Sequence, residues 1–159
     1  MRERKAKDWA KGLMAAAPSQ DPSVLLRVYG CVISPCFLRR VQGKEPRPCT
    51  NYKPCVNRYA CRPRKFRNED LRDVPRWGVP EMHMYQNDVD GAFTVVGTQR
   101  ELQPYLIEDI GPPPPGYGPH LPQYMVPLSL NFGFLNSPEL FDSVAKSFQS
   151  ACRRENLPC

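Results

Sequence analysis

Cysteines are the residues whose type and spacing could do chemistry in this chain. In CTNYKPCVNRYAC three of them recur at six-residue intervals, and the full set is Cys31, Cys36, Cys49, Cys55, Cys61, Cys152 and Cys159. A structural zinc ion needs four ligands held tetrahedrally, commonly as two close pairs. The first five cysteines could supply four ligands, but their spacing is wider than the Cys-x2-Cys pairs typical of such sites. Zinc is therefore the weaker alternative, and otherwise we expect no cofactor.

Disulfides are the stronger alternative for the same seven side chains. Cross-links stabilise a chain that cannot build a large core. Cys152 and Cys159 are close enough in sequence to close the C-terminal tail back on a helix. Buried free thiols, which behave as small apolar side chains, are the third interpretation. All three interpretations stay open, and every cysteine is a disulfide candidate.

A basic segment, residues 39–67, surrounds the central cysteines. It holds ten basic residues and one acidic residue, interleaved with three aromatic rings. Cations neutralise phosphates and rings stack on bases, so this composition suits RNA or other single-stranded nucleic acid. Arginine also pairs with carboxylates, so an acidic protein surface is an equal alternative, and lipid phosphate is a further one. The predicted partner-binding residues here are Arg39, Arg40, Arg47, Tyr52, Arg58, Tyr59, Arg64, Lys65 and Phe66.

Catalytic patterns are weak throughout the sequence. His83 and His120 are the two histidines, and neither follows a recognised nucleophile pattern with a cysteine or a carboxylate. The glycines of GPPPPGYGPH do not form a phosphate-binding loop, because proline removes the N–H groups that would bind phosphate. We therefore expect a protein that is not an enzyme and has no small-molecule substrate.

Charge is distributed unevenly along the chain. The net charges are +3 for residues 1–38, +9 for residues 39–67 and −6 for residues 68–159. The acidic second half argues against nucleic-acid binding by the whole chain and indicates that different surfaces meet different partners.

Proline dominates the fold prediction. There are nineteen prolines, and each fixes φ and removes a backbone donor. We therefore predict a mostly irregular, extended, proline-rich chain with a few short helices, at most one short strand pair and little independent core. Its predicted parts are a basic N-terminal helix with an apolar segment (1–38), the basic arm (39–67), an extended proline-rich region (68–136), and a C-terminal amphipathic helix with its tail (137–159).

Three ordered elements have local signals. Residues 138–155 predict a helix, because Pro138 suits its first turn and apolar residues recur at helical spacing. Phe141, Val144 and Phe148 are its predicted partner anchors. Residues 21–30 favour a helix capped at Asp21, with a strand as the alternative, and residues 93–96 predict a brief strand.

Targeting signals point to an organelle. The first seventeen residues are basic with a loose apolar face and resemble an organelle-targeting presequence, apart from Glu3 and Asp8. No hydrophobic signal segment precedes the cysteines, so we do not expect secretion. The longest apolar run, residues 23–38, is shorter than the roughly 20 residues that span a bilayer.

Together these features predict a non-enzymatic accessory subunit that contacts several protein subunits of a large assembly. We place it first in a respiratory-chain or ATP synthase complex at the mitochondrial inner membrane. The alternatives are a ribonucleoprotein subunit, such as a mitochondrial ribosomal protein, and a microtubule inner protein of a ciliary or flagellar axoneme.

Overall fold

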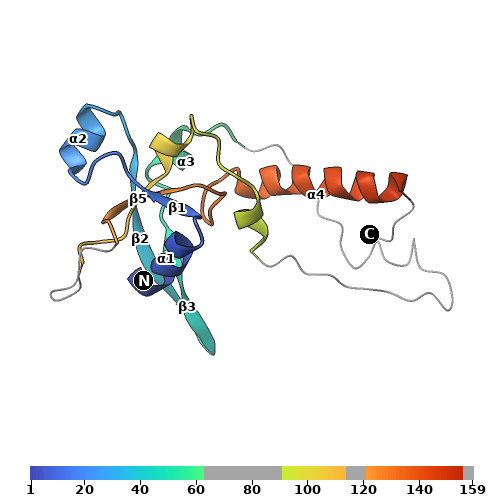
Figure 1. Cartoon of the computed structure of the whole chain (residues 1–159), viewed down its shortest axis with the longest axis horizontal. Coiled ribbons are helices and arrows are strands. Elements are labelled where there is room, and N and C mark those ends of the chain that lie inside the picture. The colour runs from blue at the N-terminus through green and yellow to red at the C-terminus, as the bar shows by residue number, and fades with distance from the viewer. Residues whose placement is uncertain (63–90, 114–120, 156–159) are drawn as a thin grey trace.

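Five strands form one mixed sheet in the computed structural model, which describes residues 1–62, 91–113 and 121–155 (Figure 1). Their order across the sheet is β1-β5-β4-β2-β3. The strands are β1 (Met14–Ala16), β2 (Ile33–Val41), β3 (Lys44–Thr50), β4 (Ile107–Asp109) and β5 (Tyr124–Pro127). β2 and β4 pair in parallel, and the other neighbouring pairs are antiparallel. The prediction of a mostly irregular chain with at most one strand pair and little core is therefore wrong.

Prolines of β3 and β5 do not prevent this sheet because they lie where a strand tolerates a missing donor. Pro46 and Pro48 belong to β3, the edge strand of the sheet. One side of an edge strand has no neighbour that requires an N–H donor. Pro127 is the last residue of β5, where pairing ends. Pro35 of the interior strand β2 precedes the residues that pair with β3, and its carbonyl still accepts a hydrogen bond from Asn51 N at 2.9 Å. The sequence interpretation failed because it counted prolines without knowing which strand would lie at an edge.

Helices surround the sheet. The α-helices are α1 (Arg2–Ala10), α2 (Pro22–Arg27), α3 (Val56–Tyr59) and α4 (Ser137–Arg154), and the 3-10 helices are η2 (Ala92–Val95) and η3 (Gln103–Leu106). The predicted helix cap is present, since Asp21 Oδ1 accepts a hydrogen bond from Ser23 N at 2.8 Å. The predicted C-terminal helix is also confirmed as α4, which extends away from the sheet (Figure 1).

The strand predicted at residues 93–96 is wrong. Thr94 N donates to Gly91 O at 2.6 Å, which closes a helical turn where extended backbone was expected. The segment is η2, and pairing resumes only at Gly97, in an isolated bridge with Ser129.

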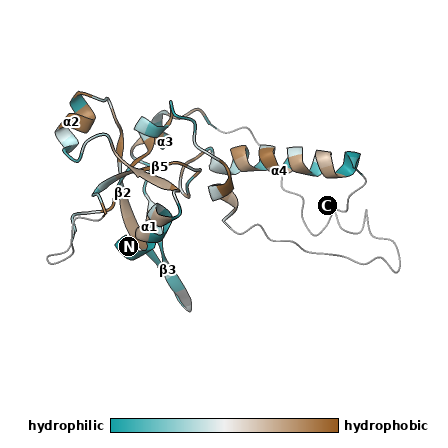
Figure 2. Ribbon diagram, in the orientation of Figure 1, coloured by the Kyte–Doolittle hydropathy of each residue, from teal (hydrophilic) through white to brown (hydrophobic). Residues whose placement is uncertain are grey.

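The apolar core consists of three clusters that meet around β4. Their buried members are Ala17, Leu25, Cys31, Ile107, Tyr124 and Val126; Met14, Ile110 and Met125; and Tyr52, Leu106 and Phe134. Each cluster receives one residue from the stretch 106–110, so this stretch is the centre of the fold. Figure 2 shows hydrophobic residues recurring along α4 as well, outside this core. Among the described residues, no helix has the length and apolar character needed to cross a bilayer.

Candidate functional site

Glu108 lies in the middle of β4, and its side chain is completely buried (0% exposed). Its Oε1 atom accepts hydrogen bonds from Thr50 Oγ1 at 2.6 Å, from Tyr52 OH at 3.0 Å, and from Asn131 Nδ2. Its Oε2 atom accepts one from Lys5 Nζ at 2.5 Å. A buried charge is tolerated only when it is paired and hydrogen-bonded. These five residues, from four distant segments of the chain, are the Glu108 cluster.

Local structure explains how the donors reach this carboxylate. α1 turns Lys5 inward while the rest of its charged residues face solvent or the surface. Thr50 is the last residue of β3 and is paired with Cys36 of β2, so both side chains leave the same face of the hairpin. The ring of Tyr52 packs edge-on against Phe134, with 6.3 Å between centroids. The donors therefore come from separate segments of the chain that only the tertiary fold brings together around Glu108.

The cluster raises three pKa values. Burial is the largest single influence on Lys5 and lowers its pKa, but the charge and hydrogen bond of Glu108, together with the charges of Cys36 and Asp8, outweigh it, so the net shift is upward. Burial, and then the charge of Glu108, raise the pKa of Tyr52 well above its usual 10.0. The same two causes raise the pKa of Cys36 from 9.0 to about 12. At neutral pH, Lys5 is therefore a cation, while Tyr52 and Cys36 keep their protons.

This arrangement suits a structural role. A general acid or base has to reach the proton that it transfers. Here the carboxylate of Glu108 is closed to solvent, and both of its oxygens are occupied by donors from the chain itself. The Glu108 cluster joins α1, the β2–β3 hairpin and β4 at one point.

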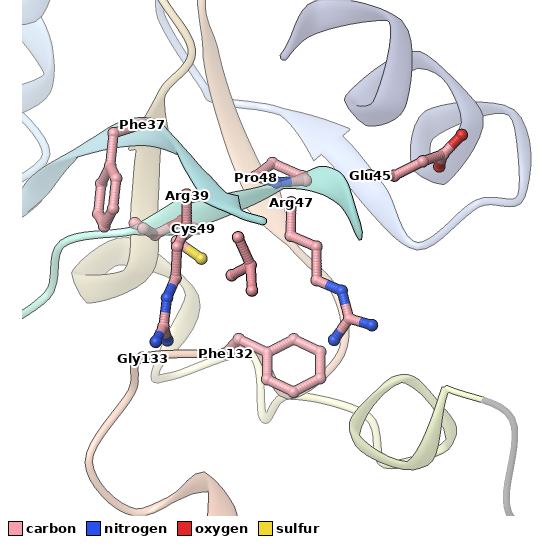
Figure 3. A pocket seen from close by; sticks show the side chains of 10 residues that line it. Phe37, Arg39, Glu45, Arg47, Pro48, Cys49, Phe132 and Gly133 are labelled. Atoms are coloured by element: carbon pink, nitrogen blue, oxygen red, sulfur yellow. The ribbon is translucent and has the colours of Figure 1, made fainter. Parts of the chain in front are cut away.

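A surface groove of about 540 Å³ lies on the other face of the β2–β3 hairpin. We call it the hairpin groove. Its lining residues include Phe37, Arg39, Val41, Arg47, Phe132 and Gly133. Arg39 of β2 is the cross-strand partner of Arg47 of β3, so the two cations leave the same face as direct neighbours. Figure 3 shows both side chains reaching from the hairpin toward the loop that carries Phe132.

The acidic residue of the groove lining, Glu45, does not form an ion pair with these arginines. Its carboxylate is turned toward α1, where Oε2 lies 3.5 Å from Arg4 Nη1 (Figure 3). Within the part of the chain that the structure describes, neither Arg39 nor Arg47 has an ion-pair partner. As far as the described residues go, the hairpin groove therefore carries two positive charges without an ion-pair partner, beside exposed apolar side chains.

Asn57 of α3 fixes the loop that forms the opposite wall of the groove through two hydrogen bonds. Asn57 Nδ2 donates to Gly133 O at 2.7 Å, and Leu135 N donates to Asn57 Oδ1 at 2.9 Å. Phe134 is buried in the core, whereas Phe132 is 58% exposed and lines the groove. The loop thus presents Phe132 from a fixed backbone.

The structure brings only part of the predicted partner surface together. Arg39 and Arg47 meet in the groove, while Arg40 stands at the register irregularity between Arg39 and Val41 and does not line the groove. Arg58 and Tyr59 are exposed on α3. Arg64, Lys65 and Phe66 lie outside the described residues.

Two predicted partner contacts are made within the chain itself. Tyr52 is 1% exposed and belongs to the core, so its ring does not reach a partner. Phe141 packs against Phe93 of η2 with 5.8 Å between ring centroids. Val144 and Phe148 remain exposed on α4.

The cysteines are dispersed in the fold. Within the described residues, Cys31, Cys36, Cys49, Cys55 and Cys61 carry free thiols, and Cys152 is buried on α4. Cys159 lies outside the described residues. No three side chains of His, Cys, Asp or Glu in the described ranges gather into a set that could hold a metal ion.

Several functional residues were missed from the sequence. Lys5, Thr50, Glu108 and Asn131 belong to the Glu108 cluster, and Phe132 forms part of the groove wall. One signal was available for Glu108, since it stands inside the apolar stretch LIEDI. Nothing in the sequence distinguished the other four from ordinary surface residues.

Comparison with known proteins adds no assignment, because neither the protein-family models nor the curated proteins contain a match to this sequence.

Proposed function

We propose that this protein is a non-enzymatic accessory subunit that docks on a partner protein within a larger assembly. The observation that carries this function is an apolar stripe on α4. Leu140, Val144 and Phe148 follow one another at four-residue spacing and are 40%, 44% and 70% exposed. Residues at that spacing share one face of a helix. A helix that leaves such a face in water is typical of a surface that a partner covers.

The stripe is presented in a defined direction. α4 is anchored at its N-terminal end, where Phe141 contacts Phe93, and Phe93 in turn contacts Phe132 with 4.8 Å between centroids. α4 extends away from the sheet (Figure 1), and Val144 and Phe148 of the stripe follow the anchoring residue Phe141 along it. A preformed helix reduces the conformational entropy that is lost on binding.

Charge on α4 favours a protein partner over an anionic membrane. The helix carries three basic residues, Lys146, Arg153 and Arg154, and two acidic residues, Glu139 and Asp142. Interfacial helices that bind anionic lipid carry a strong excess of Lys and Arg on the polar face. The near-balance of charge here suits a helix-in-groove contact with protein.

The Glu108 cluster supports a binding role over a catalytic one, since its ionisable groups are used to hold the fold. For the assembly itself, the composition favours a mitochondrial inner-membrane complex first. A ribonucleoprotein is the second candidate, because the hairpin groove offers two free arginines beside an aromatic ring.

Native fractionation of cells that express the tagged full chain tests this function. The wild type should migrate in a large complex, and Val144→Asp with Phe148→Asp should move it to the monomer fraction. Ser143→Asp with Ser150→Asp adds the same two charges to exposed positions outside the stripe and serves as the matched control.

The control variant should stay in the complex. Mass spectrometry of the co-migrating proteins then identifies the assembly as respiratory, ribosomal or other. Monomeric wild-type protein, or equal release of both variants, would contradict docking through the stripe.

A further inference from the structure

Two like charges repel each other in the hairpin groove. Arg39 and Arg47 stand directly opposite each other on one face of an antiparallel pair. Like charges in that position destabilise a hairpin, and Glu45, the acidic residue among the described lining residues, is turned toward Arg4. An anionic ligand between the two guanidinium groups would relieve the repulsion, so the site is complementary to negative charge.

The groove also has apolar surface at the right place for a flat ring. Phe132 is 58% exposed and faces the two arginines across the groove (Figure 3). Phe37 is 48% exposed at the other end of the lining. Cations that bind a backbone together with rings that stack on bases are the combination used by proteins that bind single-stranded nucleic acid.

The edge of the sheet argues against the main competing occupant, an acidic peptide. Peptides that bind beside a sheet commonly add a strand through main-chain hydrogen bonds. β3 is the edge strand, but its Pro46 and Pro48 offer no N–H donors to an incoming strand. Recognition at this groove therefore depends on side chains, which are cationic and aromatic.

We infer that the hairpin groove binds single-stranded nucleic acid, with backbone phosphates on Arg39 and Arg47 and a base against Phe132. The groove volume of about 540 Å³ lies within the range of sites that hold a ligand of nucleotide size. The described lining contains no Asn or Gln side chain that could read a base edge, so recognition is largely independent of sequence. This site goes beyond docking through α4 and uses a different face of the molecule.

Fluorescence anisotropy with a labelled oligouridylate of about twelve nucleotides tests the site on the full chain. Arg39→Gln with Arg47→Gln should weaken binding about tenfold or more. The slope of log affinity against log salt should also fall by about 1.4, since each phosphate contact on a single strand contributes about 0.7. Phe132→Ala should weaken binding about fivefold or more and leave the salt slope unchanged, because stacking involves no counterion.

Arg27→Gln with Arg40→Gln is the matched control. It removes the same charge from exposed positions outside the groove and should keep wild-type affinity. Equal losses in the control and the groove variant, or wild-type affinity in the groove variant, would overturn the site. The site would also be overturned if a poly-glutamate peptide bound more tightly than the oligonucleotide and this binding required Arg39 and Arg47. That result would favour an acidic protein partner.

The α4 stripe variant separates this site from the proposed function. Val144→Asp with Phe148→Asp should bind the oligonucleotide like the wild type, because the stripe does not line the groove. Far-ultraviolet circular dichroism should be unchanged in all variants, since every substituted side chain is exposed and none belongs to the three buried core clusters.

Discussion

Lys5 Nζ lies 2.5 Å from Glu108 Oε2, and this contact joins the N-terminal helix to the central strand across 103 residues of sequence. Both side chains are almost fully withdrawn from water. The first helix is therefore part of the core and supplies the charge that balances its only completely buried carboxylate among the described residues.

Lys5→Met should destabilise the fold strongly. Removing one partner of a buried ion pair leaves an uncompensated charge, which typically costs about 3–5 kcal/mol of unfolding free energy. Chemical denaturation measures the loss. Lys7→Met, at an exposed position of the same helix, should change stability by less than about 0.5 kcal/mol.

Adding Glu108→Gln to Lys5→Met should recover part of that loss, because the unpaired buried charge is then gone. Equal, small effects of Lys5→Met and Lys7→Met would contradict the role given to the Glu108 cluster.

Stability should fall as the pH rises from about 9 to about 12. The folded protein holds the proton of Cys36 up to a pKa of about 12, whereas the unfolded chain loses it near 9.0. In this window the unfolded state binds fewer protons, so alkali favours unfolding. The raised pKa values of Tyr52 and Lys5 act in the same direction.

Unfolding in denaturant with a reducing agent present, repeated across this pH range, measures the slope. Cys36→Ala should make the slope shallower. A stability that is independent of pH in this window would show that Cys36 is not held in a buried, protonated state.

Gly133→Ala should be more damaging than Gly43→Ala. Both glycines have positive φ, +97° and +74°, so each alanine bears a conformational cost of about 1 kcal/mol. At Gly133 the added Cβ would also lie 2.7 Å from the backbone oxygen of Thr50, whereas nothing lies within 4 Å at Gly43. We expect an additional loss of about 1–3 kcal/mol at Gly133, as for other overpacked sites.

The two unfolding midpoints, measured side by side, check this prediction. The same losses at both positions would mean that the loop bearing Phe132 does not pack against the end of β3 as described.

Arg47→Glu should stabilise the hairpin at low salt. It replaces a like-charge pair with an opposite-charge pair across from Arg39, and such cross-strand pairs contribute about 0.2–1 kcal/mol. The gain should shrink at high salt, because exposed charges are then screened. Arg40 has no cross-strand partner in the β2–β3 register and does not line the groove, so Arg40→Glu should give no comparable gain.

Unfolding free energies at low and high salt measure the difference between the two variants. A stabilisation that is the same for Arg47→Glu and Arg40→Glu would indicate a general effect of net charge, without a specific conflict in the groove.

Local signals predicted α2 and α4, whereas α3 was not predicted and η2 lies where a strand was expected. The cap at Asp21 and the periodic apolar residues of α4 act within a few residues, so the sequence shows them directly. The sheet depends on distant pairing. Its strands β1, β4 and β5 have only three or four residues each, which is too short for a periodic pattern to be recognised.

For the candidate sites too, the sequence showed local features and missed those that depend on distant pairing. Arg39 and Arg47 were predicted from the basic composition around them, but their cross-strand pairing needed the hairpin register. Tyr52 was placed on the partner surface because it stands among cations, whereas its hydroxyl is used by Glu108, 56 residues away. Composition identifies the residue types at a site, and only the tertiary fold assigns each one to the surface or to the core.

Docking through the α4 stripe is tested most directly by site-specific photocrosslinking in cells. A photoreactive amino acid replaces Val144 in one variant and Ser150, an exposed residue outside the stripe, in another. We predict a cross-link to one defined partner from position 144 and no such product from position 150. Uncross-linked monomer at both positions, or the same products from both, would contradict the account of this protein as a subunit that docks through α4.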